Sequence, residues 1–339
     1  MISNNSEIPT FDKDFSKFDI ENRAGLAVMA IEKGVAKFKK GYGLRNLETN
    51  ENVDCYTNFR MASVSKQFTA MCIAILEEKQ KLSVEDEIDQ YLSGLPKYMS
   101  EIRVSHLVHH LSGLPDYSDA LWNSDKNKPL ISNQDVFDYY KSQKKLKFKP
   151  GEKYKYSNGG YSLLSMIVEN VAGEYFPDFI DRNIFKPSNM KNTAVITYPS
   201  MIKNQAVSYS DWPFFEDIDY NTGNALHGED GVYTSLNDMQ GWIEAIETNR
   251  LVSPTMTEKL FAPARTNSGK KVKYGYGWEF DKFHKHRIIG HDGVWVGFNT
   301  IVVNVPARKL WLVAFSNSTA ISSFDAMEKM FKYYLAIDQ

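Results

Sequence analysis

Cysteine is scarce in the 339-residue sequence: Cys55 and Cys72 are the only two, and neither belongs to a metal-type pair. Two cysteines cannot form a disulfide scaffold, which excludes the small disulfide-rich folds. An excess of one charge is also missing, because 40 Lys+Arg face 42 Asp+Glu and the formal net charge is −2. Such a balanced chain lacks the basic footprint of a nucleic-acid-binding protein, so we expect no nucleic-acid partner.

Long apolar runs are missing too. The longest lies around Ala70–Leu76, far short of the roughly 20 residues of a membrane helix. The opening MISNNSEIPTFDKDF has no basic start followed by an apolar segment, so we expect no signal peptide in it. We therefore expect no membrane segment and a cytoplasmic location. The 13% of aromatic residues argue against a disordered chain.

What the chain does contain is strand signals at both ends and helix signals between them. Residues 25–32 and 35–41 indicate two strands around Lys33-Gly34, a hairpin signal. Short β-rich runs return after Lys270, Pro306-Ala307-Arg308 turns the last pair, and 322–335 indicates a closing helix. Helical spacing of apolar residues predicts helices over 60–78 and near 103–111, 133–143, 159–171, 174–184 and 236–247.

This order predicts an α+β fold. An antiparallel sheet from the N- and C-terminal segments would be flanked by helices, with a mostly helical lobe inserted between them. We expect an N-terminal tail over 1–20 and a single domain over 21–339. Its sheet lobe would span about 21–62 and 270–339, and its helical lobe about 63–269.

The first candidate for chemistry is Ser63-Val64-Ser65-Lys66. Residues i and i+3 share a helix face, so Lys66 would lie beside the Ser63 hydroxyl. Both lie opposite the most apolar stripe of a helix that should be buried nearly all round. Burial lowers the pKa of a lysine and suits it to act as a base on serine. The same S-x-x-K pattern also occurs at Ser142/Lys145, Ser188/Lys191, Ser200/Lys203 and Ser268/Lys271. The setting of Ser63, rather than the pattern, distinguishes it.

Two further motifs are weak individually. Tyr156-Ser157-Asn158 offers a phenol for acid/base work and an amide to orient substrate, or else a turn that caps the following helix. His291-Asp292-Gly293 ends a predicted strand, where a histidine can polarise a carbonyl and the next backbone N–H can face an oxyanion. The alternative for the second motif is an exposed histidine in a turn.

In this order, S-x-x-K, Y-x-N and H-x-G resemble the serine β-lactamase and penicillin-binding-protein superfamily. With Y-S-N in place of S-D-N and H-D-G in place of K-T-G, the chain resembles the class C β-lactamase branch, with its D-peptidases, D-aminopeptidases and carboxylesterases. FRMASVSKQFTA, VSHLVHHLSGLPDY, FKPGEKYKYSNGGYSLLS, GEDGVYTSLNDMQGW and YGYGWEF look like further family segments. The resemblance runs from about residue 20 to 335 and implies the β-lactamase/D,D-peptidase-like fold.

The resemblance also implies roles for residues. Ser63 would be the acylated nucleophile, Lys66 its proton acceptor and Tyr156 the proton shuttle to the leaving group. Asn158 would bind the acyl side chain or Lys66, and the N–H groups of Ser63 and Val294 would form the oxyanion hole. The remaining implied substrate-site residues are His291, in place of the usual edge-strand lysine, with Asp292, Gly293 and Trp295. No cofactor is implied, because acyl transfer by these groups needs none.

Departures from the family pattern bear on the substrate. His291 is mostly neutral at pH 7, and Asp292 would repel a carboxylate if it faced the site. Both disfavour penicillins and D-Ala-D-Ala termini and favour an ester, amide or short peptide without a nearby carboxylate. Aromatic residues that could line an apolar acyl pocket are Trp212, Phe214, Phe215, Trp295 and Tyr117.

Other interpretations stay open. A β-lactamase or D-Ala-D-Ala carboxypeptidase is the second enzyme hypothesis, and a non-catalytic sensor or scaffold on the same fold is the third. His106, His109 and His110 have spacing that can bind zinc, but H-E-x-x-H is missing and we expect no metal.

Overall fold

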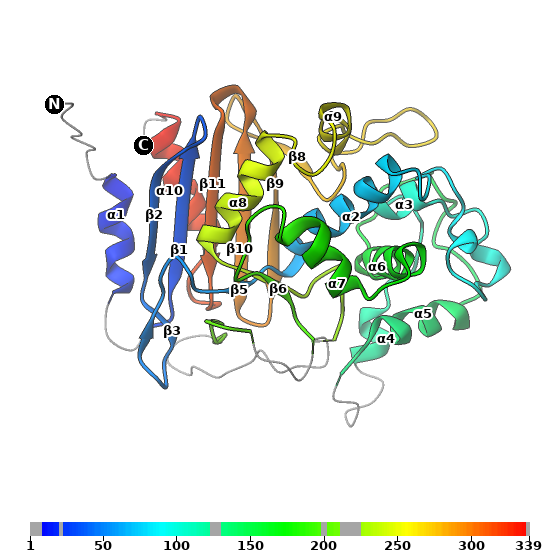
Figure 1. The fold of residues 1–339 in the computed structure, drawn as a ribbon, viewed down its shortest axis with the longest axis horizontal. Coiled ribbons are helices and arrows are strands. Elements are labelled where there is room, and N and C mark those ends of the chain that lie inside the picture. Colours follow the sequence, from blue (N-terminus) through cyan, green and yellow to red (C-terminus); the bar gives the residue numbers. More distant parts are fainter. Residues whose placement is uncertain (1–8, 20–22, 123–129, 198–201, 211–224, 337–339) are drawn as a thin grey trace.

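The computed structural model describes residues 9–19, 23–122, 130–197, 202–210 and 225–336. Its centre is a six-stranded antiparallel sheet in the order β2-β1-β11-β10-β9-β8. The strands are β1 Leu26–Glu32, β2 Val35–Tyr42, β8 Glu279–Phe283, β9 His286–Trp295, β10 Phe298–Val305 and β11 Leu310–Ser316. The two ends of the chain therefore meet in the middle of the sheet, which confirms the predicted α+β fold (Figure 1).

The hairpin predicted at Lys33-Gly34 is present. Both residues have positive φ, 53° and 76°, as a two-residue turn between twisted strands requires. Next to it, β1 pairs with β11 along its whole length, from Leu26 opposite Ser316 to Glu32 opposite Leu310.

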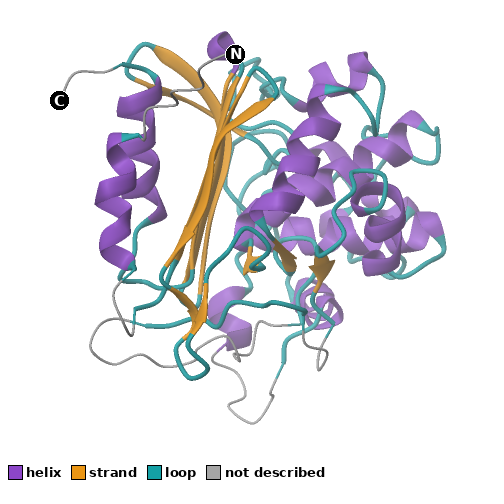
Figure 2. Cartoon of the chain, turned by 60° about the vertical axis from the view of Figure 1, so that its left-hand side comes forward, coloured by secondary structure: helices purple, strands orange, loops and turns teal. Residues whose placement is uncertain are grey.

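Each face of the sheet carries its own core. One face, with Val28, Val303 and Leu312, packs against α1 (Thr10–Phe15) and α10 (Ser323–Tyr334). The opposite face packs against the helical part of the molecule, so Figure 2 shows the sheet with helices on both sides. The expected tail over 1–20 contains α1, whose Phe11 and Phe15 are buried in the first of these cores.

The helical part follows the predicted positions, with most boundaries moved by one to several residues, and it has two further short helices, over 118–122 and 254–260. Its helices are α2 Lys66–Glu78, α3 Val104–Val108, α4 Ser118–Trp122, α5 Asn133–Ser142, α6 Asn158–Ala172, α7 Phe176–Ile180, α8 Leu236–Glu247 and α9 Pro254–Leu260. A π turn at Asp181–Phe185 continues α7. Small sheets pair β3 Leu44–Asn46 with β4 Glu51–Asn52, and β5 Phe59–Arg60 with β7 Val232–Thr234 and β6 Ala194–Val195. Within the described ranges, none of the helices combines the length and apolarity that crossing a bilayer requires.

Two features near the candidate residues differ from the expectation: the start of the helix after Arg60, and the pairing of the strand that carries His291. Arg60 belongs to strand β5, and α2 begins only at Lys66 after a 3-10 turn, η2, at Ala62–Ser65. Strand β9 is not an edge strand throughout, because β8 pairs with its first half from His286 to Gly290. Its second half, His291–Trp295, extends beyond β8 and lies against η2.

Candidate active site

Ser63 is presented from a strained turn at the start of a buried helix. Between Thr57 and Leu76 it is the one residue that is not buried. Ala62 immediately before it has a φ of 45°, in the left-handed region that costs energy for any residue with a side chain. Strain of this kind is held in place by surrounding structure and is concentrated at functional positions. The fold therefore exposes one hydroxyl from an otherwise closed segment.

Lys66 lies beside this hydroxyl and is completely buried. Its Nζ donates to Ser63 Oγ at 3.0 Å and to the backbone carbonyl of Glu229 at 2.9 Å. Burial lowers the pKa of Lys66 to about 8, against the opposing effect of four nearby carboxylates. They are Glu229, Asp230, Glu279 and Asp292. The predicted nucleophile and base are thus in hydrogen-bond contact.

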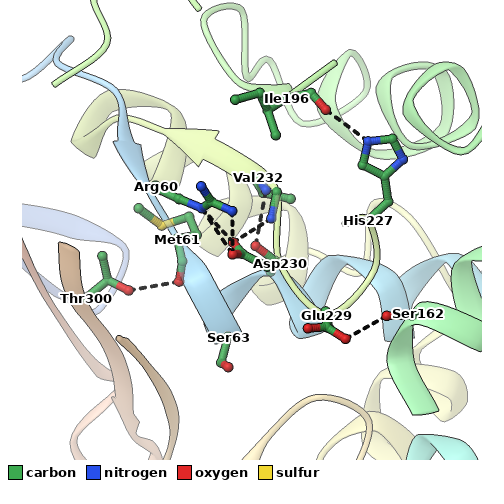
Figure 3. Close-up of polar contacts among 12 residues, drawn as sticks. Arg60, Met61, Ser63, Ser162, Ile196, His227, Glu229, Asp230, Val232 and Thr300 are labelled. Carbon is green, nitrogen blue, oxygen red and sulfur yellow. Dashed lines mark hydrogen bonds and ion pairs between the residues drawn. The ribbon is translucent and has the colours of Figure 1, made fainter. Parts of the chain in front are cut away.

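Glu229 and Asp230 are consecutive residues on a loop, and their carboxylates turn to different partners (Figure 3). The Glu229 carboxylate accepts hydrogen bonds from Tyr117 at 2.5 Å and Ser162 at 2.6 Å. Asp230 binds the guanidinium of buried Arg60 through Nε at 3.0 Å and a terminal nitrogen at 2.8 Å. Each buried carboxylate is paired, so the loop is fixed where its carbonyl receives Lys66.

Tyr156 closes the site from the side of α6. Burial raises the pKa of its hydroxyl well above the ordinary value, and a hydrogen bond with Ser63 acts in the opposite direction. Lys66 Nζ lies 5.0 Å from the centre of the Tyr156 ring. Ser157 caps α6 by accepting from the Gly160 N–H at 3.3 Å, and Asn158 is its first residue, half-buried. The structure therefore brings Tyr156 to Ser63 and Lys66, with Asn158 following it at the start of α6.

Strand β9 approaches the backbone of Ser63 at Gly293. A Cβ on Gly293 would lie 2.4 Å from the Met61 carbonyl oxygen and 2.8 Å from the Ser63 nitrogen. Opposite Gly293 on β10, Thr300 donates to the same Met61 carbonyl at 2.9 Å. Only glycine allows the strand this close, and the approach places the Gly293–Val294 backbone beside the serine.

His291 is buried, and both of its ring nitrogens have partners. Nδ1 lies 2.6 Å from the Asp292 carbonyl, which can only accept, so Nδ1 carries the proton. Nε2 then accepts from the Tyr274 hydroxyl at 3.0 Å. Burial lowers the pKa of His291 to about 3, with a further lowering by Lys66. The ring is therefore neutral, as expected, and it is held within the site wall instead of being exposed in a turn.

The structure describes some of the remaining residues predicted from sequence and leaves others outside the described ranges. Asp292 is half-buried, burial raises its pKa, and its charge raises the pKa of Lys66. The Val294 side chain is 62% exposed, and the Trp295 ring lies 5.7 Å from the Arg60 guanidinium carbon. Tyr117 is buried and its hydroxyl donates to Glu229, so it does not line an open acyl pocket. Trp212, Phe214 and Phe215 lie outside the described residues.

Sequence reasoning missed several groups that shape the site. Glu279 at the start of β8 has its pKa raised to about 7 by burial and by the charges of Asp292 and Asp281. Tyr274 holds His291, and Glu229 contacts Lys66 through its carbonyl. Glu229, Tyr274 and Glu279 lie in the family-like segments GEDG and YGYGWEF, which could have drawn attention to them.

The three histidines with helical spacing have separate partners. His106 Nδ1 accepts from the Arg103 N–H at 3.0 Å and caps α3. His109 Nδ1 lies 3.2 Å from the Gly275 carbonyl, and His110 Nδ1 accepts from the Ser157 N–H at 3.1 Å. Among the described residues, no group of three or more His, Cys, Asp or Glu is arranged to hold a metal ion.

The lowered pKa of Lys66 leads to a pH prediction. If neutral Lys66 accepts the Ser63 proton, kcat/KM rises with pH and levels off above about 8. The Glu229 carboxylate raises the Lys66 pKa, so Glu229→Gln should move this rising limb to lower pH. The measurement is kcat/KM from pH 5.5 to 10 for both proteins. Glu244→Gln, on the exposed surface of α8, should leave the limb in place. An unshifted limb in Glu229→Gln would contradict the assignment.

A serine with a buried lysine and a half-buried tyrosine, set against a six-stranded antiparallel sheet, defines a serine hydrolase of the β-lactamase and D-peptidase type. The chain belongs to the Beta-lactamase family, whose model matches residues 11–332.

The chain is also similar to individual penicillin-binding proteins and D-aminopeptidases. Penicillin-binding protein 4* of Bacillus subtilis (strain 168) is 29% identical over 318 residues, which cover 88% of this chain and 69% of that protein. The D-aminopeptidase of Gluconobacter oxydans (strain 621H) is 24% identical over 299 residues, 86% of this chain but 55% of the relative. The solved octameric penicillin-binding protein homologue from Pyrococcus abyssi has a TM-score of 0.82 at 23% identity, over 96% of this chain and 76% of that one. The chain thus spans between half and three quarters of these proteins.

Proposed function

We propose that the protein cleaves an ester or amide through an acyl-enzyme on Ser63, with an esterase-like preference for substrates without a carboxylate near the scissile bond. The observation that carries the proposal is the 3.0 Å contact between Ser63 Oγ and a buried Lys66 whose pKa is about 8. A lysine with this pKa is partly neutral near pH 7 and can accept a proton.

The reaction has two steps. In the first, Ser63 Oγ attacks the carbonyl carbon while its proton moves to Lys66 Nζ. The oxyanion is bound by the N–H groups of Ser63 and Val294. Tyr156, whose raised pKa keeps it a phenol, protonates the leaving group and regains a proton from the Lys66 ammonium. In the second step, water attacks the acyl carbon, its proton passes to neutral Lys66 directly or through the Tyr156 hydroxyl, and the Lys66 ammonium then protonates Ser63 Oγ as it leaves.

The charge around the site supports the substrate preference. Neutral His291 supplies no cation to bind a carboxylate. Asp292 and Glu279 place acidic groups close enough to affect Lys66, and their charges would repel a substrate carboxylate. An ester or a simple amide avoids this cost. Asn158, at the start of α6, would bind the acyl side chain or Lys66.

A second candidate is a penicillin-binding D-peptidase or β-lactamase, which is favoured by the similarity to penicillin-binding protein 4*. The two candidates differ in which substrate acylates Ser63. The test is intact-mass spectrometry after brief exposure to p-nitrophenyl butyrate and, separately, to benzylpenicillin.

We expect a butyryl adduct from the ester, absent in Ser63→Ala, and no adduct from the penicillin. A penicillin adduct on Ser63 would assign the protein to the second candidate. A folded wild-type protein without any adduct would contradict both.

A further inference from the structure

We propose that His110 is a positioning residue that fixes Tyr156 against Ser63 by holding the backbone on both sides of the tyrosine. The inference rests on the proposed function, because it assigns Tyr156 a working orientation in acyl transfer. His110 contacts neither Ser63 nor the reacting atoms by any hydrogen bond of the described residues, so it would act through Tyr156.

His110 accepts two hydrogen bonds from the backbone around Tyr156, and we call this pair of contacts the clamp. The N–H of Lys155, just before Tyr156, donates to the His110 carbonyl at 3.0 Å. The N–H of Ser157, just after it, donates to His110 Nδ1 at 3.1 Å. His110 thus accepts hydrogen bonds from the backbone N–H groups of both residues that flank Tyr156. These two bonds restrict the backbone conformation of Tyr156.

The backbone of His110 is specialised for this double contact. Its φ is 57°, a left-handed conformation that is uncommon for residues other than glycine, asparagine and aspartate. In this conformation the carbonyl and the side chain of His110 both contact the segment 155–157. Strain at this position is consistent with a functional constraint.

The imidazole ring also packs directly on the tyrosine. The His110 and Tyr156 ring centres are 4.3 Å apart at 34°, and Tyr274 packs at 4.4 Å on another side. Burial lowers the pKa of His110 well below its ordinary value, with Lys66 and His291 contributing, so the ring stays neutral. A neutral ring is required, because Nδ1 must accept from Ser157 and the proton must then lie on Nε2.

The polarity of His110 argues against simple space filling. Nε2 is buried and has no hydrogen-bond partner among the described residues. A buried polar group without a partner costs stability, so an apolar ring would serve better if packing were the only need. What an apolar ring would lose is the acceptor for the Ser157 N–H, the contact that fixes the Tyr156 backbone.

The test uses a matched pair of variants. His110→Asn keeps an acceptor near the Nδ1 position and tolerates the left-handed backbone, whereas His110→Gly tolerates the backbone but removes the acceptor. With p-nitrophenyl butyrate, we expect His110→Gly to lower kcat on the order of 10- to 100-fold with KM nearly unchanged, as for a misplaced catalytic group. His110→Asn should retain most of kcat. His109→Asn, next in sequence but directed at Gly275, is the control and should keep wild-type kcat.

Two further readouts separate positioning from a general structural effect. In a Tyr156→Phe background, His110→Gly should have almost no additional effect on kcat, because the tyrosine hydroxyl through which it acts is gone. Amide hydrogen exchange at Ser157, which needs no turnover, should accelerate in His110→Gly and stay slow in His110→Asn.

Each outcome decides between the possibilities. A folded His110→Gly protein with wild-type kcat, or one with unchanged Ser157 exchange, overturns the inference. An equal loss of kcat with and without Tyr156→Phe also overturns it. If His110→Gly does not fold, His110→Asn decides: retained kcat supports the inference, and loss in a folded protein refutes it. Absence of any Ser63 adduct in the wild type would refute the proposed function instead, while the exchange measurement would still test the clamp.

Discussion

Replacing Lys66 with methionine is expected to lower kcat/KM for an activated ester by about 10³-fold or more. Methionine is similar in length and apolar, so it fits the fully buried position, but it cannot accept the Ser63 proton. The Ser63 hydroxyl, 3.0 Å from Nζ in the wild type, then remains a poor nucleophile. The measurement is steady-state kinetics with p-nitrophenyl butyrate, together with thermal unfolding to show that the variant is folded.

Lys79 provides the control for this experiment. It follows the last residue of the same helix and is exposed, and its Nζ donates to Asn183 Oδ1 at 3.3 Å. Lys79→Met should leave kcat/KM within about twofold, as expected for a surface substitution away from the site. A folded Lys66→Met protein with near wild-type turnover would exclude Lys66 as the base and leave Tyr156 as the group to test.

The largest effect on stability is expected from Arg60→Leu. Arg60 is completely buried, and its guanidinium binds Asp230 at 2.8 and 3.0 Å. Removing one partner of a buried ion pair leaves the other charge without compensation, which costs about 3–5 kcal/mol of the free energy of unfolding. Because Asp230 adjoins Glu229, the loop that receives Lys66 should loosen as well. Urea unfolding measures the loss through a lower transition midpoint.

An exposed arginine pair of similar length gives the comparison. Arg103 lies 2.9 Å from Glu85, and their side chains are 49% and 65% exposed. Arg103→Leu should cost less than about 1 kcal/mol, because water already screens the pair. Replacing Arg60 and Asp230 together by leucine should recover part of the loss, since no buried charge is then left unpaired. Similar losses from Arg60→Leu and Arg103→Leu would contradict this account.

Local patterns in the sequence are sufficient for the elements that depend on neighbouring residues. The hairpin at Lys33-Gly34 follows from turn chemistry, and the Ser63–Lys66 contact follows from i, i+3 spacing across the turn that leads into α2. Tyr156 and His291 are not linked to Ser63 by any local rule. Their selection depended on the order of motifs shared with a known family, and the fold brings both into the site.

Family-like segments contain Glu229 and Glu279, but neither segment indicates what these residues do in the site. The Glu229 carbonyl accepts from Lys66 across 163 residues of sequence, and Glu279 acts on Lys66 through space. His110 was weighed as a zinc ligand for its spacing to His106 and His109, yet its partners are on the segment that carries Tyr156. Such effects depend on burial and tertiary proximity, to which a single sequence gives no direct access.

The place of β1 between β2 and β11 has a consequence for how the protein is made. Leu26, among the first residues of the sheet to leave the ribosome, pairs with Ser316, and Gly293 must close on the backbone of Ser63. Contacts between such distant residues form late and slowly, because a long loop must close before they bring any gain. The helical part can assemble during translation, while the β1–β2 hairpin stays unpaired with β11 until that strand has been synthesised. Hydrolytic activity is then a property acquired in one late step, when β9 to β11 have all been synthesised, and a nascent chain arrested earlier would be inert.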